Sequence, residues 1–416
     1  MIDTINGLIN RKSIRIVIIA ILSLMAAVSL IKGCMNAARV SQDFQWDAAK
    51  ALSLNLDPYM ISMHPDEKIE VEGLREYYSL YEQAGTPQKM EANQFPSLLM
   101  LLIPYTMMRP LTARYAWLIS NLIFTAIILA VLRATFLKNA DRFCYAAVCL
   151  LIIAGTPYRN QLGVGQHTVF AFCFFLLAVF FDSKEEAYAK VLTPICLFIC
   201  FFKYTVTAPL AIYFIYKKRI LSLITAVLGH VAFTIMWAIR LNRSIADMII
   251  EPLKVASNLS SEGGLDLGAV FGGSVISYVL LIVIGLGLVI IAVRMEEGHD
   301  NWFFAVLIMW SLILMYHRTY DFFILGVSSA MFITDGDKVA KTKACKGRYY
   351  YPLLYYYVVV LLAVFFGLRI FSENIVSRIC VGTLYYILTV ISTIVLIMQS
   401  GNLKRLKETE NEFEVV

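Results

Sequence analysis

The chain has 416 residues, of which 59% are hydrophobic and only 16% are charged, and its formal net charge is +6. Soluble domains are about 45–50% apolar and about 25% charged, so this composition excludes an ordinary soluble protein. The basic residues stand in short links between apolar runs, which is typical of cytoplasmic loops rather than of a nucleic-acid-binding surface. We therefore expect one integral membrane domain over residues 1–416 and no nucleic-acid partner.

The first apolar run predicts a membrane-spanning helix over about residues 14–34. Arg11, Lys12 and Arg15 lie at its start, and basic residues favour the cytoplasmic side of a membrane. We expect a retained signal anchor with its N-terminus inside, which delivers the next segment to the far side. That segment, residues 35–110, is predicted to be a first outer loop carrying short interfacial helices.

Two carboxylates, Asp43 and Asp47, open this loop one helical turn apart. The spacing predicts a short helix over 43–53 with both carboxylates on one face, ended by Asn55 and Pro58. Two carboxylates so close raise each other's proton affinity, which favours a base tuned towards neutral pH. The alternative for Asp47 is a solvated residue paired with a lysine of the same helix.

Two later apolar runs do not fit a simple alternation of spans. The run from Phe95 to Met108 is short and contains two prolines, so we expect a membrane-dipping or interfacial helix that begins and ends outside. The run over 189–216 is interrupted by Lys203 and Pro209, and two short spans fit the flanking charges better than one long span.

Basic residues orient the rest of the chain. They place the links at 217–219 and 338–348 inside, together with a tail at 400–416. Alternation then predicts a span at about 349–371 and outer segments at 157–166, 241–271, 317–320 and 372–379. The fold class expected is an all-α polytopic membrane protein with roughly twelve transmembrane helices and both termini inside, and 241–271 as a second sizeable outer loop.

Polar side chains gather at the outer ends of these helices although they are far apart in the sequence. Ionisable groups at membrane depth cost several kcal/mol unless they are paired or hydrated, so they are functional candidates by default. Cations at the mouth of a lipid-facing cavity suit an anionic phosphate head group. Interfacial anchoring is the alternative for any one of them. The set comprises Asp43, Asp47, Asp57, Arg159, Asn160, Gln161, Gln166, His167, Lys203, His317, Arg318, Tyr320 and Asp321.

Five short motifs follow one another along the chain: Asp43-Phe44 with Asp57-Pro58-Tyr59, Phe95-Pro96-Ser97-Leu98 with Pro104, Gly165-Gln166, Lys203 before Lys217-Lys218-Arg219, and His317 with Tyr320-Asp321. In this order they resemble glycosyltransferase family 87, whose members include polyprenyl-phosphate-mannose-dependent mannosyltransferases with a GT-C-type membrane fold. The resemblance covers about residues 14–335. The sequence departs from the family in having Asn55-Leu56 where a glycine often precedes the Asp-Pro-Tyr motif, and Pro96-Ser97 where the family has a proline pair.

The resemblance implies a hexosyltransferase that moves a sugar, such as mannose, from a polyprenyl-phosphate donor to a glycolipid or glycan acceptor. It implies that Asp43 is the catalytic base, with Asp47 as a neighbouring carboxylate. One base suffices for an inverting transfer when the leaving group is a phosphate stabilised by cations. The candidates for binding the donor phosphate are Arg159, Lys203, His317 and Arg318, and those for binding other parts of the substrate are Tyr59, Gln166, His167, Tyr320 and Asp321.

No cofactor or metal is expected, because such a donor has no nucleotide diphosphate to bind. The location implied is the inner (plasma) membrane, with the active site on the periplasmic or extracytoplasmic side and membrane lipid as a partner. The main alternative is a multi-span transporter or flippase of lipid or polysaccharide. Transporters tend to contain internal repeats and polar helices at the midplane, whereas here the polar residues are predicted at one face.

Overall fold

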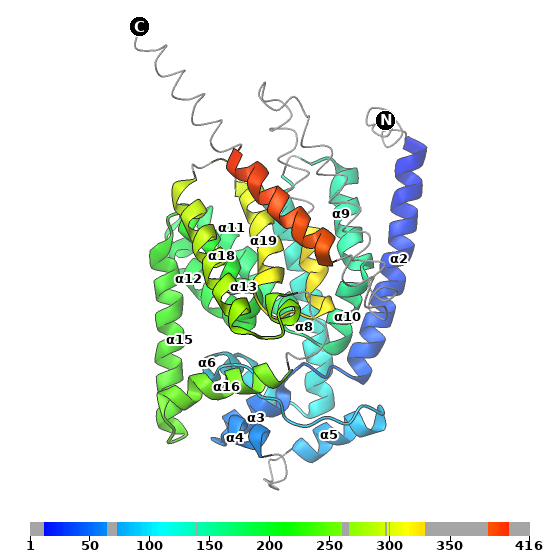
Figure 1. Ribbon diagram of the computed structural model, residues 1–416. Helices are drawn as coiled ribbons and strands as arrows, with labels where there is room; N and C mark the ends of the chain where they lie inside the picture. Colours follow the sequence, from blue (N-terminus) through cyan, green and yellow to red (C-terminus); the bar gives the residue numbers. More distant parts are fainter. Residues whose placement is uncertain are drawn as a thin grey trace.

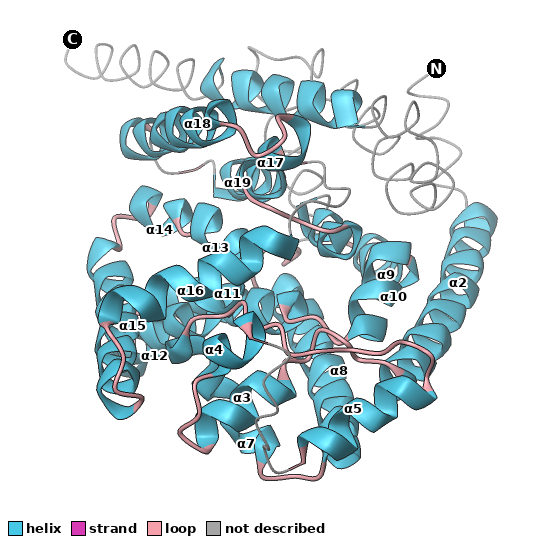
Figure 2. Cartoon of the chain, turned by 60° about the horizontal axis from the view of Figure 1, so that its bottom comes forward, coloured by secondary structure: helices cyan, strands magenta, loops and turns pink. Residues whose placement is uncertain are grey.

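The computed structural model describes residues 12–64, 73–138, 140–259, 266–295, 298, 300–328 and 382–398. In these residues the regular secondary structure is helical, with loops between the helices and no strand (Figure 2). The elements are α2 (Lys12–Arg39), α3 (Trp46–Ser53), α4 (Pro58–Met63), α5 (Leu74–Gln83), α6 (Pro96–Leu99), η1 (Met100–Leu102), α7 (Ile103–Thr106), α8 (Pro110–Ala134), α9 (Arg142–Ala154), α10 (Thr156–Val164), α11 (Thr168–Asp182), α12 (Ala187–Cys200), η2 (Phe201–Lys203), α13 (Tyr204–Leu210), α14 (Ile212–Tyr216), α15 (Ile220–Arg240), α16 (Ile245–Leu259), α17 (Leu267–Val270), α18 (Val275–Arg294), α19 (Asp300–Leu314) and η3 (Thr319–Ile324), followed by a helix over Gly382–Met398.

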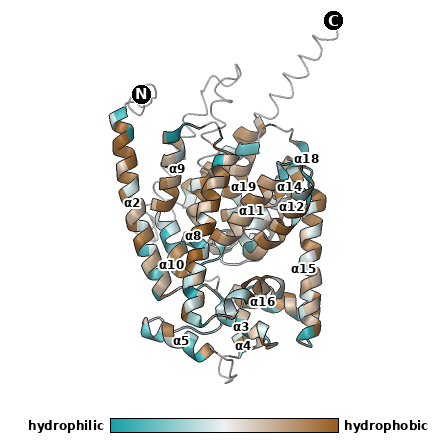
Figure 3. Cartoon of the chain, turned by 180° about the vertical axis from the view of Figure 1, so that it is seen from behind, coloured by the Kyte–Doolittle hydropathy of each residue, from teal (hydrophilic) through white to brown (hydrophobic). Residues whose placement is uncertain are grey.

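Five helical runs in the described residues are long and apolar enough to cross a membrane, or six if α10 and α11 form one broken span. By length and composition the five are Lys12–Arg39, Pro110–Ala134, Ala187–Leu210, Ile220–Arg240 and Val275–Arg294, and the third of them is divided by the turn at η2. Their apolar residues cover the sides of the bundle, and the hydrophilic residues concentrate towards its two ends (Figure 3). The class of protein that this fold defines is therefore an α-helical membrane protein, as the composition predicts.

One ion pair shows which helices begin together at the end of the bundle away from α3, α4 and α5. Arg15, near the start of α2, lies 3.0 Å from Asp141 at the start of α9, so these helices begin at the same level. α10 continues from α9 towards the outer loop, and the chain turns by 109° between α10 and α11. α11 then returns along α8, because Phe170 contacts Trp117 and Phe174 contacts Phe124.

The run over 187–216 reverses direction at η2, in agreement with the two short segments predicted there. Arg219 lies 2.8 Å from Asp182, which stands only a few residues before α12. A straight helix from Ala187 to Tyr216 would separate its ends by about 45 Å at 1.5 Å per residue, so the ion pair excludes a straight path. The reversal places Lys203 at the tip of the two segments.

Helices α3, α4 and α5 of the segment 35–110, predicted as the first outer loop, form a layer across one end of the bundle together with α16 (Figure 1). Its two parts, separated by almost two hundred residues, are joined by Arg243, which lies 3.0 Å from Asp57. Large aromatic side chains such as Phe44, Trp46 and Tyr59 are fully buried in its core. The short elements α6, η1 and α7 follow one another as an apolar helix over Pro96–Thr106, which is shorter than a full span, as predicted for the run between Phe95 and Met108.

The helix predicted over 43–53 is shorter than expected. α3 begins at Trp46, because Gln45 adopts a left-handed conformation with φ 56°. Asp43 therefore lies in the preceding loop, and the prediction that it shares a helix face with Asp47 is wrong. The end is as predicted: Asn55 is left-handed with φ 60°, and Pro58 starts the next helix. The Asp57 side chain caps that helix by accepting bonds from the backbone amides of Tyr59 and Met60.

The first helix runs from Lys12 to Arg39 and so extends beyond the predicted 14–34 at its outer end. Four expectations lie outside the described residues: the inside link at 338–348, the span at about 349–371, the outer segment at 372–379 and the tail at 400–416.

Candidate functional site

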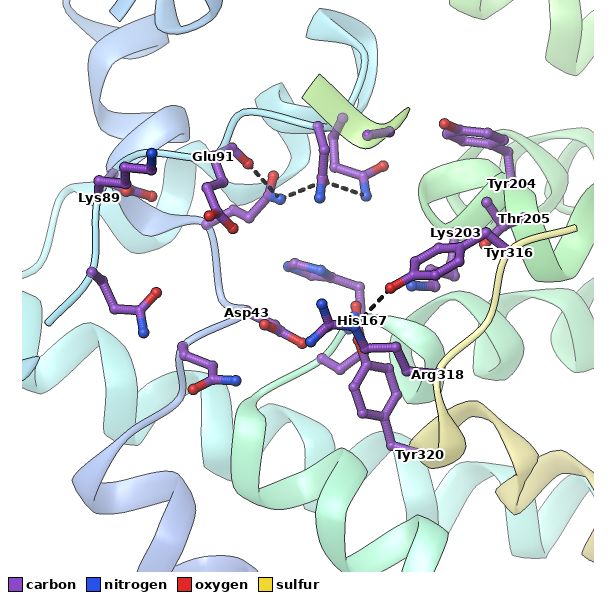
Figure 4. A pocket seen from close by; sticks show the side chains of 18 residues that line it. Asp43, Lys89, Glu91, His167, Lys203, Tyr204, Thr205, Tyr316, Arg318 and Tyr320 are labelled. Atoms are coloured by element: carbon purple, nitrogen blue, oxygen red, sulfur yellow. Dashed lines mark hydrogen bonds between the residues drawn. The ribbon is translucent and has the colours of Figure 1, made fainter. Parts of the chain in front are cut away.

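A polar cavity of about 290 Å³ lies between the outer loop and the ends of the bundle helices (Figure 4). It combines segments that are far apart in the sequence: the loop before α3, the turn before α11, the tip at η2 and the segment before η3. The residues that line it are Gln42, Asp43, Gln45, Asp47, Gln88, Lys89, Glu91, Asn93, Gln94, Gln166, His167, Lys203, Tyr204, Thr205, Ala256, Tyr316, Arg318 and Tyr320.

The loop that carries Asp43 is held in an unusual backbone conformation. Ser41 and Gln45, on either side of it, both have positive φ values, of 44° and 56°. Non-glycine residues rarely adopt this region, and such strain persists only where the surroundings over-determine it. Here the Asp43 amide donates to the Val164 carbonyl at 2.8 Å, and the Ser41 hydroxyl donates to Ala37 at 2.6 Å. The surrounding contacts therefore fix the place of the Asp43 carboxylate.

The turn between α10 and α11 packs directly against this loop. Gly165 has φ 68°, and a Cβ added to it would stand 3.1 Å from both Cβ and Oγ of Ser41. The position thus requires glycine for both its conformation and its close approach. The Trp117 indole donates to the Gly165 carbonyl at 2.7 Å, and His167 Nε2 lies 3.0 Å from the Phe44 carbonyl. Since a carbonyl only accepts, His167 carries its proton on Nε2 in this contact.

Gln166 connects Asp43 to Tyr320 of η3. Its Nε2 group donates to Asp43 Oδ2 at 3.2 Å and to the Tyr320 hydroxyl at 2.8 Å. Its Oε1 atom accepts from the His167 amide at 2.7 Å, which fixes the orientation of the side-chain amide. Tyr320 in turn hydrogen-bonds to Asp43. Gln166 and Tyr320 are therefore positioned to orient the carboxylate.

The pKa of Asp43 is set by opposing effects. Burial is the largest, and it raises the pKa of this carboxyl above its usual value. The positive charges of Lys203 and Arg318 and the hydrogen bond from Tyr320 lower the pKa, but they do not cancel the effect of burial. The result is a partly exposed carboxylate with increased proton affinity, which is the property a general base needs.

Asp321 lies behind the cavity wall and is fully buried. Its Oδ2 atom is 3.9 Å from Lys203 Nζ and 3.4 Å from His317 Nδ1, and Oδ1 accepts from the Thr168 hydroxyl. Burial raises the pKa of Asp321, but Lys203 and the His317 contact outweigh it, so the pKa lies below its usual value. Asp321 thus neutralises Lys203, and the excess of positive charge at the site is smaller than the sequence suggested.

Asp47 occupies a separate environment from Asp43. The Tyr78 hydroxyl donates to Asp47 Oδ2 at 2.9 Å, and the Ala48 amide donates to Oδ1 at 2.9 Å. Burial raises the pKa of Asp47 to about 6, and the acidic residue that adds to the shift is Glu91, not Asp43. The carboxylate that raises the pKa of Asp43 is Asp321. The predicted mutual tuning of Asp43 and Asp47 is therefore wrong, as is the alternative in which Asp47 is solvated.

One wall of the cavity is rich in amide side chains, and its neighbour Glu91 lies on the side of the cavity away from Lys203 (Figure 4). This wall comes from the outer loop and consists mainly of Gln45, Asn93 and Gln94, with Asp47 and Glu91 beside them. Gln45 Nε2 donates to the Asn93 side-chain oxygen and to the Glu91 carbonyl, the latter at 3.2 Å. Sequence reasoning missed this wall, because uncharged amides in an outer loop gave no periodic or charge signal.

The cavity gathers some of the predicted site residues and leaves others aside. Asp43, Asp47, Gln166, His167, Lys203, Arg318 and Tyr320 line it. Asp321 and His317 lie behind the wall in contact with each other. Arg159 lies on α10, where its carbonyl faces Gly33 of α2, and it does not line the cavity. Tyr59 does not line it either: it is buried in the core of the outer layer, where its hydroxyl donates to the Gln94 carbonyl at 2.7 Å. Tyr204 and Tyr316 are lining residues that the sequence did not single out.

The described residues contain no cluster of three or more metal-ligating side chains. No protein-family model matches the chain, and neither a curated protein nor a solved structure matches it. The site is therefore interpreted from its own geometry.

Proposed function

We propose that this protein is a membrane glycosyltransferase that moves a sugar, such as mannose, from a polyprenyl-phosphate donor to an acceptor glycan or glycolipid. The observation that carries the proposal is the cavity in which the carboxylate of Asp43 and the cations of Lys203 and Arg318 converge from three distant segments. The order of motifs that resembles glycosyltransferase family 87 supports the same assignment.

The proposed reaction is an inverting displacement at the anomeric carbon. The acceptor oxygen forms a bond to that carbon as the bond to the donor phosphate breaks, and the acceptor proton passes to Asp43. Negative charge thereby moves from the carboxylate to the departing phosphate. Lys203 and Arg318 stabilise that developing charge, so no second carboxylic acid is required.

The two walls of the cavity suit the two ends of such a substrate pair. The cationic wall, with Lys203 and Arg318, fits the donor phosphate. The amide wall, with Gln45, Asn93 and Gln94, offers both donors and acceptors to sugar hydroxyls. Asp43 stands between the two walls, where an acceptor hydroxyl meets the anomeric carbon.

The finer architecture belongs to the same proposal. A GT-C-type bundle of about twelve spans in the inner (plasma) membrane, with the Asp43 cavity on the extracytoplasmic face, accounts for the basic links at the opposite end. The large outer loop then supplies both the base and the amide wall.

The test uses the full chain reconstituted in liposomes with a panel of synthetic polyprenyl-phosphate hexoses. We expect release of free polyprenyl phosphate and transfer of the sugar to a glycan or glycolipid acceptor. Movement of a labelled lipid across the bilayer without any sugar transfer would instead identify a flippase. Neither transfer nor movement with any member of the panel would also contradict the proposal.

A further inference from the structure

A second cavity lies far from Asp43, at the other end of the bundle. It is a groove of about 1090 Å³ between α12 and α15, closed at one end by the links 183–186 and 217–219. α11 connects the two sites: it starts next to His167, which lines the Asp43 cavity, and ends at Asp182, which lines the groove. Fifteen helical residues span roughly 22 Å, so the charged end of the groove lies near the opposite face of a membrane.

The lining of the groove divides by chemistry along its length. The end formed by the two links carries four basic and two acidic side chains: Lys184, Lys190, Lys218 and Arg219, with Asp182 and Glu185. Further along the helices the lining is apolar and includes Val191, Pro194, Ile195, Phe198 and Phe233. A charged end followed by an apolar trough matches a molecule with a polar head and a hydrocarbon tail.

The charged side chains at this end of the groove indicate whether the polar head group that fits there is anionic or cationic. Arg219 is held 2.8 Å from Asp182, so this acid and this base neutralise each other. Lys184, Lys190 and Lys218 are exposed, and in the described part of the chain none of them lies within ion-pair distance of a carboxylate. Three lysines opposed by Glu185 and by Glu186 of the same link still leave this end of the groove with an excess of one positive charge.

The apolar part of the groove faces outward, where the chain meets lipid. Val191 is 59% exposed and Ile195 is 47% exposed on α12, and Leu221 is 76% exposed at the start of α15. The two helices approach closely at one point of the trough, where a Cβ added to Gly229 of α15 would stand 3.1 Å from the ring of Phe198 of α12. A straight hydrocarbon chain fits such a trough between two tilted helices better than a bulky solute does.

We propose that this groove binds an anionic glycerophospholipid from the leaflet opposite the Asp43 cavity. Its phosphate lies among Lys184, Lys190 and Lys218, and an acyl chain lies along Ile195 and Phe198. Basic pockets between transmembrane helices on the cytoplasmic side are suited to anionic head groups. The site is independent of sugar transfer, so it stands whether or not the proposed function is correct.

The test measures thermal unfolding of the full chain in an uncharged detergent, with phosphatidylglycerol or phosphatidylcholine of identical acyl chains added. We expect a saturable rise in Tm with phosphatidylglycerol and little rise with phosphatidylcholine. Each lysine near an anionic lipid contributes about fivefold in affinity, so the combined variant Lys184→Gln, Lys190→Gln and Lys218→Gln should bind on the order of 100-fold more weakly.

Two further variants separate a built site from diffuse charge. Lys12→Gln, Lys138→Gln and Arg142→Gln together remove the same charge at the same end of the bundle, and they should leave the response unchanged. Thr225→Trp keeps every charge but fills the groove, whereas Thr225→Ala does not, so only the tryptophan should abolish the response. The proposal is overturned by equal effects of the two lipids, by equal loss in both charge variants, or by full retention of phosphatidylglycerol binding in Thr225→Trp.

Discussion

The buried pair of Lys203 and Asp321 offers a prediction that requires no knowledge of the substrate. The side chain of Asp321 is 1% exposed and that of Lys203 is 12% exposed, with 3.9 Å between Nζ and Oδ2. Replacing Lys203 with methionine keeps the length of the side chain but leaves Asp321 with the Thr168 hydroxyl, His317 and the Arg318 amide. We expect a clear loss of stability.

The magnitude follows from the distance and the burial. At an effective dielectric constant of about 20, two unit charges 3.9 Å apart attract by on the order of 4 kcal/mol, before the cost of desolvation. Removing one partner of a buried pair commonly costs about 3–5 kcal/mol because the other charge stays uncompensated. Lys203→Met should therefore cost about 3 kcal/mol, and Lys203→Met combined with Asp321→Asn should cost less than the two single changes added together. The expected coupling is about 1–3 kcal/mol.

The assay is a double-mutant cycle on the free energy of unfolding in detergent, at pH 7 and at pH 4. Because Lys203 depresses the pKa of Asp321, the stability that this pair contributes is present at neutral pH and is lost as the pH falls through the range where Asp321 becomes protonated. Without Lys203, burial becomes the dominant effect on Asp321 and raises its pKa, so the variant regains stability by protonating this carboxyl as the pH falls towards 4, and the Lys203→Met penalty should shrink there. Additive single effects at pH 7, within about 0.5 kcal/mol, would refute the role assigned to the pair.

Three further predictions concern the residues around Asp43. Burial raises the folded-state pKa of Asp47 from 3.8 to about 6, so the free energy of unfolding should fall by on the order of 3 kcal/mol as the pH rises from about 4 to 6. In a pH series of unfolding measurements, Asp47→Asn should flatten this dependence. An unchanged slope would contradict the prediction. Gly165→Ala should destabilise the protein by about 1–3 kcal/mol. Gly85 also has a positive φ but no neighbouring atom within 4 Å of an added Cβ, so Gly85→Ala should cost less. Equal effects in thermal melts would contradict the packing of Gly165 against Ser41. Tyr320→Phe removes a hydrogen bond that lowers the pKa of Asp43, so the acidic limb of the pH profile of sugar transfer should move to higher pH; no movement would argue against that contact.

The membrane class and several local features of the fold could be predicted from the sequence. Charge asymmetry correctly indicated the reversal near Lys203, because basic links on both sides of the run had to lie at the same face. The short run with prolines at 96 and 104 correctly indicated a helix too short for a full span. Such features depend on local composition, which a single sequence displays directly.

The arrangement around Asp43 could be predicted only in part. The sequence brought Asp43, Lys203 and Arg318 to one face, since all three stand at helix ends on the same side. It could not show that Gln45 would turn left-handed and exclude Asp43 from α3. Nor could it show that Asp321 would neutralise Lys203, because that contact depends on how η2 packs against η3 in three dimensions.

The amide wall and the place of Arg159 were beyond sequence reasoning for a different reason. Gln45, Asn93 and Gln94 carry no charge and follow no helical period, so nothing marks them until the outer loop folds back over the bundle. Arg159 was grouped with the other cations by its predicted depth alone. Depth alone does not bring a residue to the cavity: the backbone carbonyl of Arg159 packs against Gly33 of α2, and Arg159 does not line the cavity.

The most direct test of the central claim compares Asp43→Asn with Asp47→Asn in reconstituted membranes that contain a polyprenyl-phosphate hexose and an acceptor. Asparagine keeps the size of aspartate and the contact with Gln166 but removes the base. General-base catalysis is typically worth about 10²–10⁴-fold, so Asp43→Asn should reduce the rate of sugar transfer by at least 100-fold. Asp47→Asn, which alters the buried contact with Tyr78, should reduce it far less. Transfer at the wild-type rate by Asp43→Asn would contradict the account.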